Sequence, residues 1–386
     1  MSRDNSGENA RPSAINRRSC VRPSAVTRLL IPSSNARSSS TPRRMSIPSM
    51  PSSSSARWIV SSPTRSSSRF VARLLLVAIM CNARSEIRII LPIDACTSEF
   101  ASRSALTWNS CPSEALARKS EARAIAVSLH DTENGSELQY DADRWFHGAS
   151  TIKVAILLAV YGEIDRGRLA RQSRLHVRNR FLSAYDGSPF RVLADRDADS
   201  EVHAAIGKTM RVSELALHMI ATSSNLATNL LLDLIGLETV QRTVERFGLT
   251  GVDVRRGVED EKAYEHGIVN RVTANGLVSL LRLIAEERAY TPELSREMLD
   301  ILHQQEFKKG IPARLPREVR VAHKTGDIST VAHDAGVVYP PSRKPYVIAI
   351  LSEWSAEVGS RSTTIASISQ LVYEGLRGSA SEAANA

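Results

Sequence analysis

Ser150 and Lys153 are residues whose types and spacing could do chemistry. They lie three residues apart at the start of a nearly apolar stretch, residues 146–162, FHGASTIKVAILLAVYG. Residues three apart share one face of a helix, so the hydroxyl and the amine can meet there. The start of a helix favours developing negative charge, and burial lowers the pKa of a lysine towards the neutral amine, which can activate a serine. Taken alone, the pair also fits a capping serine and a lysine that reaches solvent.

A second cluster is Ser223, Ser224 and Asn225, with Asn229 four residues further on. The apolar spacing predicts a helix over residues 225–235, which would present both asparagines on one face. Ser223 would then lie just before the helix. Alternatively, one of the two serines has only a structural role, as the N-cap of this helix.

A third cluster follows at the end of an expected strand, where Lys324, Thr325 and Gly326 supply a cation, a hydroxyl and a place where a substrate can approach the backbone closely. An exposed strand end would look the same. The three clusters together, in this order, resemble the motifs of the penicillin-recognising serine enzymes, and more closely those of the class A β-lactamase family. The motifs are Ser-x-x-Lys, Ser-Asp-Asn with serine in the middle position, and an intact Lys-Thr-Gly, and the resemblance runs from about Ala115 to the C-terminal helix.

This resemblance implies an acyl-enzyme mechanism. Ser150 would be the acylated nucleophile, with Lys153 as its hydrogen-bonded partner and base. Ser223 would pass a proton to the leaving nitrogen. The backbone N–H groups of Ser150 and Asp327 would form the oxyanion hole, a feature worth a few kcal/mol in such enzymes.

The resemblance also implies a substrate site. Asn225 would hold a substrate amide, and Lys324 with Thr325 and Gly326 would bind the substrate carboxylate. Asn229 would brace the loop that follows its helix. The implied function is hydrolysis of β-lactams or related amides, and the alternatives are a D-alanyl-D-alanine peptidase or esterase, a β-lactam sensor that stays acylated, and a scaffold without chemistry.

The loop after the second cluster departs from the family pattern. Class A enzymes place a glutamate that activates water in an Arg-x-Glu-x-x-x-Asn frame. Here residues 254–273 offer Glu259 and the two acids after it, none followed four residues later by asparagine. Arg255 or Arg256 and Asn270 could be remnants of the frame. Glu259 is therefore either the deacylating base or part of a solvated loop, and acylation is a firmer prediction than turnover.

The first 112 residues differ from the rest in composition. Residues 1–110 hold 16 Arg, no Lys and 5 acids, a charge of +11, whereas the whole chain carries +9, so the remainder is near −2. The high pI thus gives no reason to expect a nucleic-acid-binding body. We expect residues 1–112 to be a disordered Ser/Arg-rich leader, either an export segment or sequence ahead of a misplaced start, and residues 113–386 to be the enzyme domain.

Targeting signals are weak. Residues 69–83 form a poor secretory signal well inside the chain, no run of apolar residues is long enough for a membrane span, and all four cysteines lie at or before Cys111. The family resemblance implies a periplasmic or secreted protein. We expect a monomer that acts on a small molecule, a β-lactam or a D-alanyl peptide, with no nucleic acid as partner and no cofactor.

The periodicity predicts two early and three late strands that flank a block of helices, and hence one sheet built from both ends of the chain with the helices as a second lobe. Together with the resemblance, this predicts an α/β fold with a five-stranded antiparallel sheet flanked by helices, an all-helical lobe, and the serine site at their junction. The expected strands are residues 124–131, 137–140, 319–324, 335–339 and 346–354. The expected helices begin near Ser150 and cover 212–220, 225–235, 238–247, 273–287, 292–305 and 361–376. Residues 181–190 are expected to form a structured loop.

Other catalytic arrangements fit less well. The sequence around Ser150 has Ile152 where the Gly-x-Ser-x-Gly motif of α/β-hydrolases needs its second glycine. His333 and Asp334 could suggest a Ser/His/Asp triad, although we expect them to anchor the neighbouring strand. The nine histidines form no His-Glu-x-x-His motif, so no metal site is expected.

Overall fold

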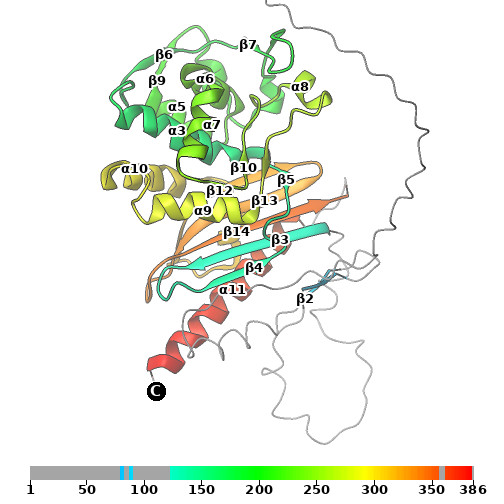
Figure 1. Cartoon of the computed structure of the whole chain (residues 1–386), viewed down its shortest axis with the longest axis vertical. Helices are drawn as coiled ribbons and strands as arrows, with labels where there is room; N and C mark the ends of the chain where they lie inside the picture. The colour runs from blue at the N-terminus through cyan, green and yellow to red at the C-terminus, as the bar shows by residue number, and fades with distance from the viewer. Residues whose placement is uncertain (1–78, 82–86, 90–121, 356–360, 385–386) are drawn as a thin grey trace, which may run out of the picture. The chain divides into compact units, whose positions relative to one another are not determined.

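The computed structural model describes residues 79–81, 87–89, 122–355 and 361–384 (Figure 1). Most of the expected leader, residues 1–112, and most of the candidate export segment, residues 69–83, lie outside the described residues. The exceptions are β1 (Ile79–Cys81) and β2 (Ile87–Ile89), which pair as antiparallel strands. The predictions of leader disorder and of export therefore stay predictions.

A five-stranded antiparallel sheet joins the two ends of the folded region, as the sequence predicted (Figure 1). Its strand order is β12-β13-β14-β3-β4, so the early strands pair with the late ones through β3 and β14. The strands are β3 (Ala122–Asp131), β4 (Glu137–Tyr140), β12 (Arg320–Ile328), β13 (Val331–Tyr339) and β14 (Tyr346–Trp354). β12 is an edge strand and runs beyond the predicted end at Lys324, because its pairing with β13 continues to Ile328.

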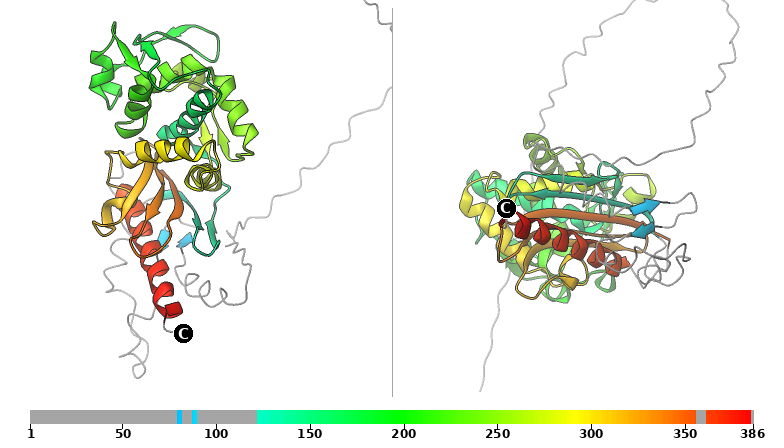
Figure 2. Two further views of the ribbon diagram at one scale, coloured as in Figure 1. Left: turned by 90° about the vertical axis from the view of Figure 1, so that its left-hand side faces the viewer. Right: turned by 90° about the horizontal axis from the view of Figure 1, so that it is seen from below.

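Helices cover both faces of this sheet. α9 (Ala274–Ala285) packs on one face and α11 (Arg361–Ala384) on the other (Figure 2). Side chains alternate between the two faces along a strand. Ala124 and Ala126 accordingly join the core beneath α9, whereas Ile125 and Val127 pack with the side chains of α11.

The helical lobe forms around α3 (Lys153–Asp165), which is buried on nearly every side because its residues are apolar all round. The surrounding helices are α4 (Ser200–Ala204), α5 (Val212–Ala221), α6 (Asn225–Ile235), α7 (Leu237–Arg246), α8 (Glu261–Glu265) and α10 (Pro292–His303). Short 3-10 turns are η2 (Ala149–Ile152), η3 (Ala194–Arg196) and η4 (Ile311–Arg314). One continuous core joins this lobe to the α9 face of the sheet.

Short strands complete the domain. β5 (Phe146–His147), β10 (Val252–Asp253) and β11 (Arg271–Val272) form a three-stranded sheet in the order β10-β11-β5. β6 (Arg174–His176) pairs with β9 (Thr209–Arg211), and β7 (Phe181–Leu182) pairs with β8 (Pro189–Phe190). The predicted loop at 181–190 is therefore a small hairpin, whose two phenylalanine rings lie 5.8 Å apart.

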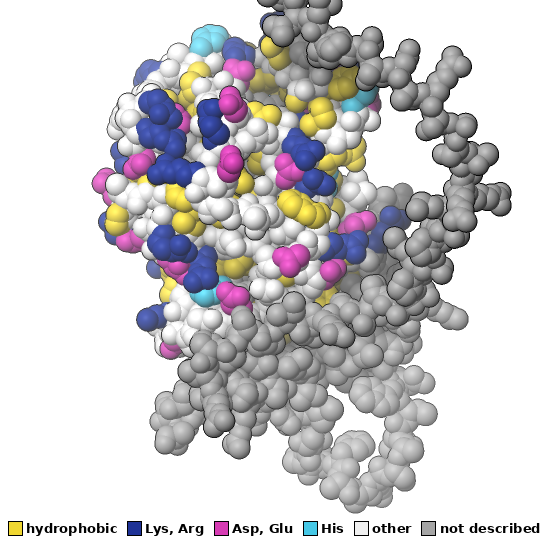
Figure 3. All heavy atoms as spheres, in the orientation of Figure 1, with side chains coloured by type: hydrophobic (Ala, Val, Ile, Leu, Met, Phe, Trp, Pro, Cys, Tyr) yellow, Lys and Arg dark blue, Asp and Glu magenta, His cyan; other side chains and the backbone are white. Residues whose placement is uncertain are grey.

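The surface of the domain carries charges of both signs. On the face shown in Figure 3, basic and acidic side chains are interspersed over both lobes. Ion pairs of the domain include Arg171 with Glu297 and Arg282 with Glu286. Within the part of the chain that the structure describes, no helix is long and apolar enough to cross a membrane.

Candidate active site

Ser150 lies on the 3-10 turn η2, which leads directly into α3. The sequence predicted one helix from this point, but the serine sits on the tighter turn. The turn is held at its start: Ala149 N–H donates to His147 Nδ1 at 3.0 Å, and Gly148 N–H donates to Asn270 O at 2.8 Å. Ala149 adopts a left-handed φ of 43°, a conformation that non-glycine residues keep only where their surroundings impose it.

Lys153, one turn further on, is fully buried. Its Nζ donates to Ser223 O at 2.7 Å, to Ser223 Oγ at 3.1 Å and to Asn225 Oδ1 at 2.8 Å. The first two predicted motifs therefore meet at the lysine amine. Among the described residues Lys153 makes no hydrogen bond to Ser150, so the lysine is bonded to the second motif rather than to the serine of its own.

Burial controls the charge of this lysine. Loss of solvent lowers the pKa of Lys153 to about 7, against the opposing attraction of the Asp197 and Glu259 carboxylates. A buried amine with a pKa near neutrality is a usable general base because a large fraction is unprotonated at physiological pH. The alternative of a lysine that extends to solvent does not fit this environment.

The second motif is positioned by the start of α6. Ser224 is the N-cap residue, and its Oγ accepts the N–H of Ala227 at 3.1 Å. Ser223, just outside the helix, has a left-handed φ of 61°. The capping interpretation is thus correct for Ser224, while Ser223 is left to contact Lys153. Asn225 also donates from Nδ2 to Arg196 O at 3.1 Å.

The third motif lies on the edge strand β12, which contacts η2. Lys324 is fully buried, donates to Thr325 O at 2.9 Å, and has a pKa lowered well below its ordinary value by burial and by the nearby Lys153. A β-carbon added at Gly326 would lie 3.1 Å from Ser150 N, which is tighter than an ordinary contact, so glycine lets the strand lie this close to the serine without displacing it. Asp327 follows, exposed and paired with Arg361 at 2.9 Å.

Asn229 braces the loop after α6, as expected, through a pair of hydrogen bonds with Val258. Its Nδ2 donates to Val258 O at 2.8 Å and its Oδ1 accepts Val258 N–H at 2.9 Å. If the Arg-x-Glu frame begins at Arg256, the position of the glutamate is Val258, and the carboxylate has moved to the next residue, Glu259. The position four residues after Val258 is Lys262.

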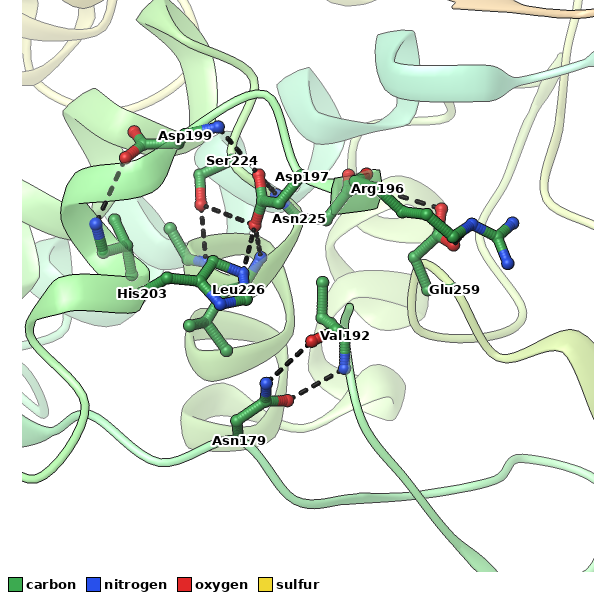
Figure 4. A network of polar contacts seen from close by, with 12 residues as sticks. Asn179, Val192, Arg196, Asp197, Asp199, His203, Ser224, Asn225, Leu226 and Glu259 are labelled. Atoms are coloured by element: carbon green, nitrogen blue, oxygen red, sulfur yellow. Dashed lines mark hydrogen bonds and ion pairs between the residues drawn. The ribbon is translucent and has the colours of Figure 1, made fainter. Parts of the chain in front are cut away.

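Glu259 nevertheless reaches the site, because its left-handed φ of 61° redirects the chain. Its Oε1 lies 3.5 Å from Asn225 Nδ2, and its Oε2 lies 2.9 Å from Arg196 Nε (Figure 4). The arginine contact is an ion pair without hydrogen-bond alignment, since Oε2 has no aligned donor among the described residues. Burial raises the pKa of Glu259, and the attraction of Arg196 opposes this.

Asn270, suggested by the sequence as a remnant of the frame, closes the other end of the loop. Its Oδ1 accepts the N–H groups of Arg255 at 2.7 Å and Arg256 at 3.0 Å, and its Nδ2 donates to Arg256 O at 3.0 Å. Its backbone carbonyl holds Gly148, as described above. The loop and the serine turn are therefore tied to one another through a single asparagine.

His333 and Asp334 form no triad with Ser150. His333 Nε2 donates to His147 O at 2.9 Å, and burial lowers the pKa of the ring to about 4, so the imidazole is neutral and serves as an anchor. Asp334 instead bonds to His323 Nδ1 at 2.9 Å and to Ile311 N–H at 2.8 Å. Within the described residues there is no cluster of three potential metal ligands.

Two residues in the network were not singled out from the sequence, Arg196 and Asp197. Both lie on a polar segment 28 or more residues before Asn225, with no periodicity and no motif. They are close to the site only because the turn containing η3 lies against the start of α6 (Figure 4). No local pattern in the sequence could have identified them.

The fold and the site geometry are those of the penicillin-recognising serine enzymes, with Ser150 and the buried amine of Lys153 at the junction of the sheet lobe and the helical lobe. A model described as the Beta-lactamase enzyme family matches residues 113–376, and the chain belongs to that family. It is similar to a β-lactamase of Streptomyces fradiae, with 30% identity over 68% of this chain and 84% of the relative. It is also similar to the β-lactamase ROB-1 of Haemophilus influenzae, with 30% identity over 61% of this chain and 74% of the relative.

Solved structures agree with this assignment. The structure of PBP-A has 26% identity and a TM-score of 0.58, covering 66% of this chain and 90% of its own. An ancestral class A β-lactamase has 25% identity and a TM-score of 0.56, covering 65% of this chain and 94% of its own. The predicted fold and the predicted class A family are thus confirmed. The catalytic roles of individual residues stay predictions.

Proposed function

We propose that this protein is a β-lactam hydrolase that forms an acyl-enzyme at Ser150 and releases it with Glu259 as base. The observation that carries the proposal is the buried amine of Lys153, bonded to Ser223 and Asn225 one turn after the serine, with a pKa of about 7.

In the proposed acylation, Ser150 Oγ attacks the lactam carbonyl carbon while its proton passes to the neutral amine of Lys153. The oxygen of the tetrahedral intermediate is stabilised by the N–H groups of Ser150 and Asp327. The carbon–nitrogen bond of the ring then breaks, and Ser223 Oγ gives its proton to the leaving nitrogen. The contact of 3.1 Å between Lys153 Nζ and Ser223 Oγ provides the path by which the lysine returns its proton to Ser223.

Substrate binding is assigned to the groups around this path. The Nδ2 of Asn225, on the side of its amide away from Lys153, is proposed to hold the acyl amide. The buried Lys324 and its neighbour Thr325 are proposed to bind the carboxylate. Burial and the nearby Lys153 disfavour the charged form of Lys324, and a substrate carboxylate beside the amine would favour that form again, because water does not screen the pair.

In the proposed deacylation, Glu259 takes a proton from water as the water oxygen attacks the ester carbon, and the ester bond to Ser150 breaks. The raised pKa of Glu259 makes it a stronger base than an exposed carboxylate would be. Its ion pair with Arg196 keeps part of the carboxylate occupied, so this step is expected to be slower than acylation.

A second candidate is an enzyme of the same chemistry whose β-lactam adduct persists, such as a D-alanyl-D-alanine peptidase or a sensor. The observation that favours it is Val258, which holds the braced position where the frame calls for glutamate. A variant of PBP-A, one of the similar structures, was solved as an acyl-enzyme complex with penicillin G.

Intact-mass measurement after incubation with a fluorescent penicillin tests the proposal. We expect one adduct on the wild type and none on Ser150→Ala. The adduct should disappear with time in the wild type and persist in Glu259→Gln. Absence of any adduct in both the wild type and Glu259→Gln would sink the proposal, whereas equal persistence in both would favour the second candidate, with cleavage of a D-alanyl peptide separating the peptidase from the sensor.

A further inference from the structure

Asp197 is a fully buried carboxylate at the start of α6 that belongs to a different segment of the chain. Its Oδ1 accepts the N–H of Asn225 at 2.9 Å, and its Oδ2 accepts the N–H of Leu226 at 2.8 Å (Figure 4). Two free N–H groups at a helix start are thus bonded to one carboxylate, and the negative charge also suits the helix dipole. The side chain therefore fixes the backbone of Asn225 directly.

The same carboxylate contacts the middle residue of the second motif. Ser224 Oγ donates to Asp197 Oδ2 at 3.3 Å. In the Ser-Asp-Asn motif this middle position is itself an aspartate, and here it is serine. A negative charge is therefore present beside the motif, but it is supplied by a residue 27 positions earlier in the chain.

Asp197 also acts on Lys153 through its charge. Of the groups that favour the protonated amine, Asp197 has the larger effect and Glu259 the smaller. Lys153 in turn disfavours the charged form of the buried Lys324. Asp197 is in turn contacted by His203 Nε2 at 3.2 Å, so this histidine belongs to the same network.

We infer that Asp197 is a positioning residue for the reaction: it replaces the missing aspartate of the motif, fixes the backbone of Asn225 beside Lys153, and supplies the buried negative charge near the amine. This inference rests on the proposed function for its kinetic part. The placement of the carboxylate at the backbone of α6 does not depend on that function.

The test compares Asp197→Asn with Asp195→Asn, an exposed residue of the same turn that undergoes the same change of charge. In Asp197→Asn the introduced amide can accept only one of the two N–H groups and presents a donor to the other. We expect acylation by the fluorescent penicillin to slow by about tenfold or more, from the loss of a hydrogen bond to a charged acceptor. We also expect the rise of the acylation rate with pH, the acid limb of its pH profile, to shift to lower pH. The reason is that Lys153 loses a neighbour that favours its protonated form.

A charge-swapped variant separates positioning from general stability. Asp197→Asn combined with Ser224→Asp returns the carboxylate to the motif, where it can still accept the N–H of Ala227 as a cap, and the introduced asparagine can donate to it. We expect the acylation rate and the acid limb to return towards the wild type. Ser224→Asp alone places two carboxylates together in a buried site and should lower stability.

Amide hydrogen exchange provides a readout that needs no activity. The N–H groups of Asn225 and Leu226 should exchange faster in Asp197→Asn and at the wild-type rate in Asp195→Asn. An unacylated wild type would defeat the proposed function, and the exchange rates would still decide whether Asp197 fixes α6. An acylated wild type with unchanged rate and exchange in Asp197→Asn would overturn the inference. If Asp197→Asn does not fold, the double variant Asp197→Asn with Ser224→Asp decides. A folded double variant that is still acylated slowly would also overturn the inference.

Discussion

Changing the pH across neutrality changes the charge of Lys153 and should therefore change the rate at which Ser150 is acylated. The amine must be neutral to accept the serine proton, and burial places its pKa at about 7. The neutral fraction then rises from roughly one eleventh at pH 6 to ten elevenths at pH 8, so the acylation rate should rise about tenfold over this interval. An exposed lysine would give a rise that continues towards pH 10.

The assay is the second-order rate of labelling by a fluorescent penicillin in rapid-quench mixing, at constant ionic strength. In Lys153→Arg the introduced side chain stays charged at every pH tested, so this variant should lose both the labelling of Ser150 and its dependence on pH. Glu259→Gln should move the midpoint to lower pH, since the carboxylate favours the protonated amine. Lys208→Met, which removes an exposed lysine of the same lobe, serves as the control. A rate independent of pH between 6 and 8, or a midpoint near that of a free lysine, would refute Lys153 as the base.

Three further outcomes are expected. Gly326→Ala adds a β-carbon 3.1 Å from Ser150 N, so thermal unfolding should show a loss of about 1–3 kcal/mol and labelling of Ser150 should slow; unchanged labelling would mean that the strand can move aside. His333 stays neutral in the fold with a pKa of about 4 but protonates near 6.5 when unfolded, so stability should fall by about 3 kcal/mol as the pH drops through this window, and denaturant titrations of His333→Gln should show a smaller fall. Val258→Glu with Lys262→Asn restores the glutamate frame at the position that is braced, and should shorten the lifetime of the penicillin adduct measured by mass; an equal or longer lifetime would show that position alone does not supply the base.

The sequence was sufficient where the chemistry depends on local spacing. Ser150 and Lys153 are one turn apart, Lys324 and Gly326 are on one strand, and the apolar periodicity predicted the elements that carry them. In the structure, β12 packs against η2 and α6 packs against α3, so the three motifs come together next to one continuous core. The contact between Lys153 and Ser223 follows from that packing and from no spacing in the sequence.

The sequence was insufficient where backbone conformation decides which residue faces the site. Residues 254–273 contain three consecutive acids, and no pattern distinguishes them. In the structure, Asn229 forms hydrogen bonds with the backbone of Val258. The left-handed backbone at Glu259 then directs the carboxylate of that residue towards Asn225 and Arg196. Asp260 instead turns away and accepts the N–H groups of Ala184 and Ala263.

The groups proposed for acylation and the group proposed for deacylation are held by very different sets of contacts. The groups proposed for acylation are held by buried contacts from three separate elements, and Lys153 alone has three hydrogen bonds with partners on or next to α6. The group proposed for deacylation is held by one long contact to Asn225 and one ion pair to an arginine whose side chain is nearly half exposed. Catalytic groups work best when packing and further hydrogen bonds hold them in place, so we expect a base with so few contacts to slow deacylation. Under the proposed mechanism, we therefore expect release of the acyl group to be the step that distinguishes this protein from a relative with glutamate in the braced position, and we expect Arg196 to influence its rate through the ion pair with Glu259.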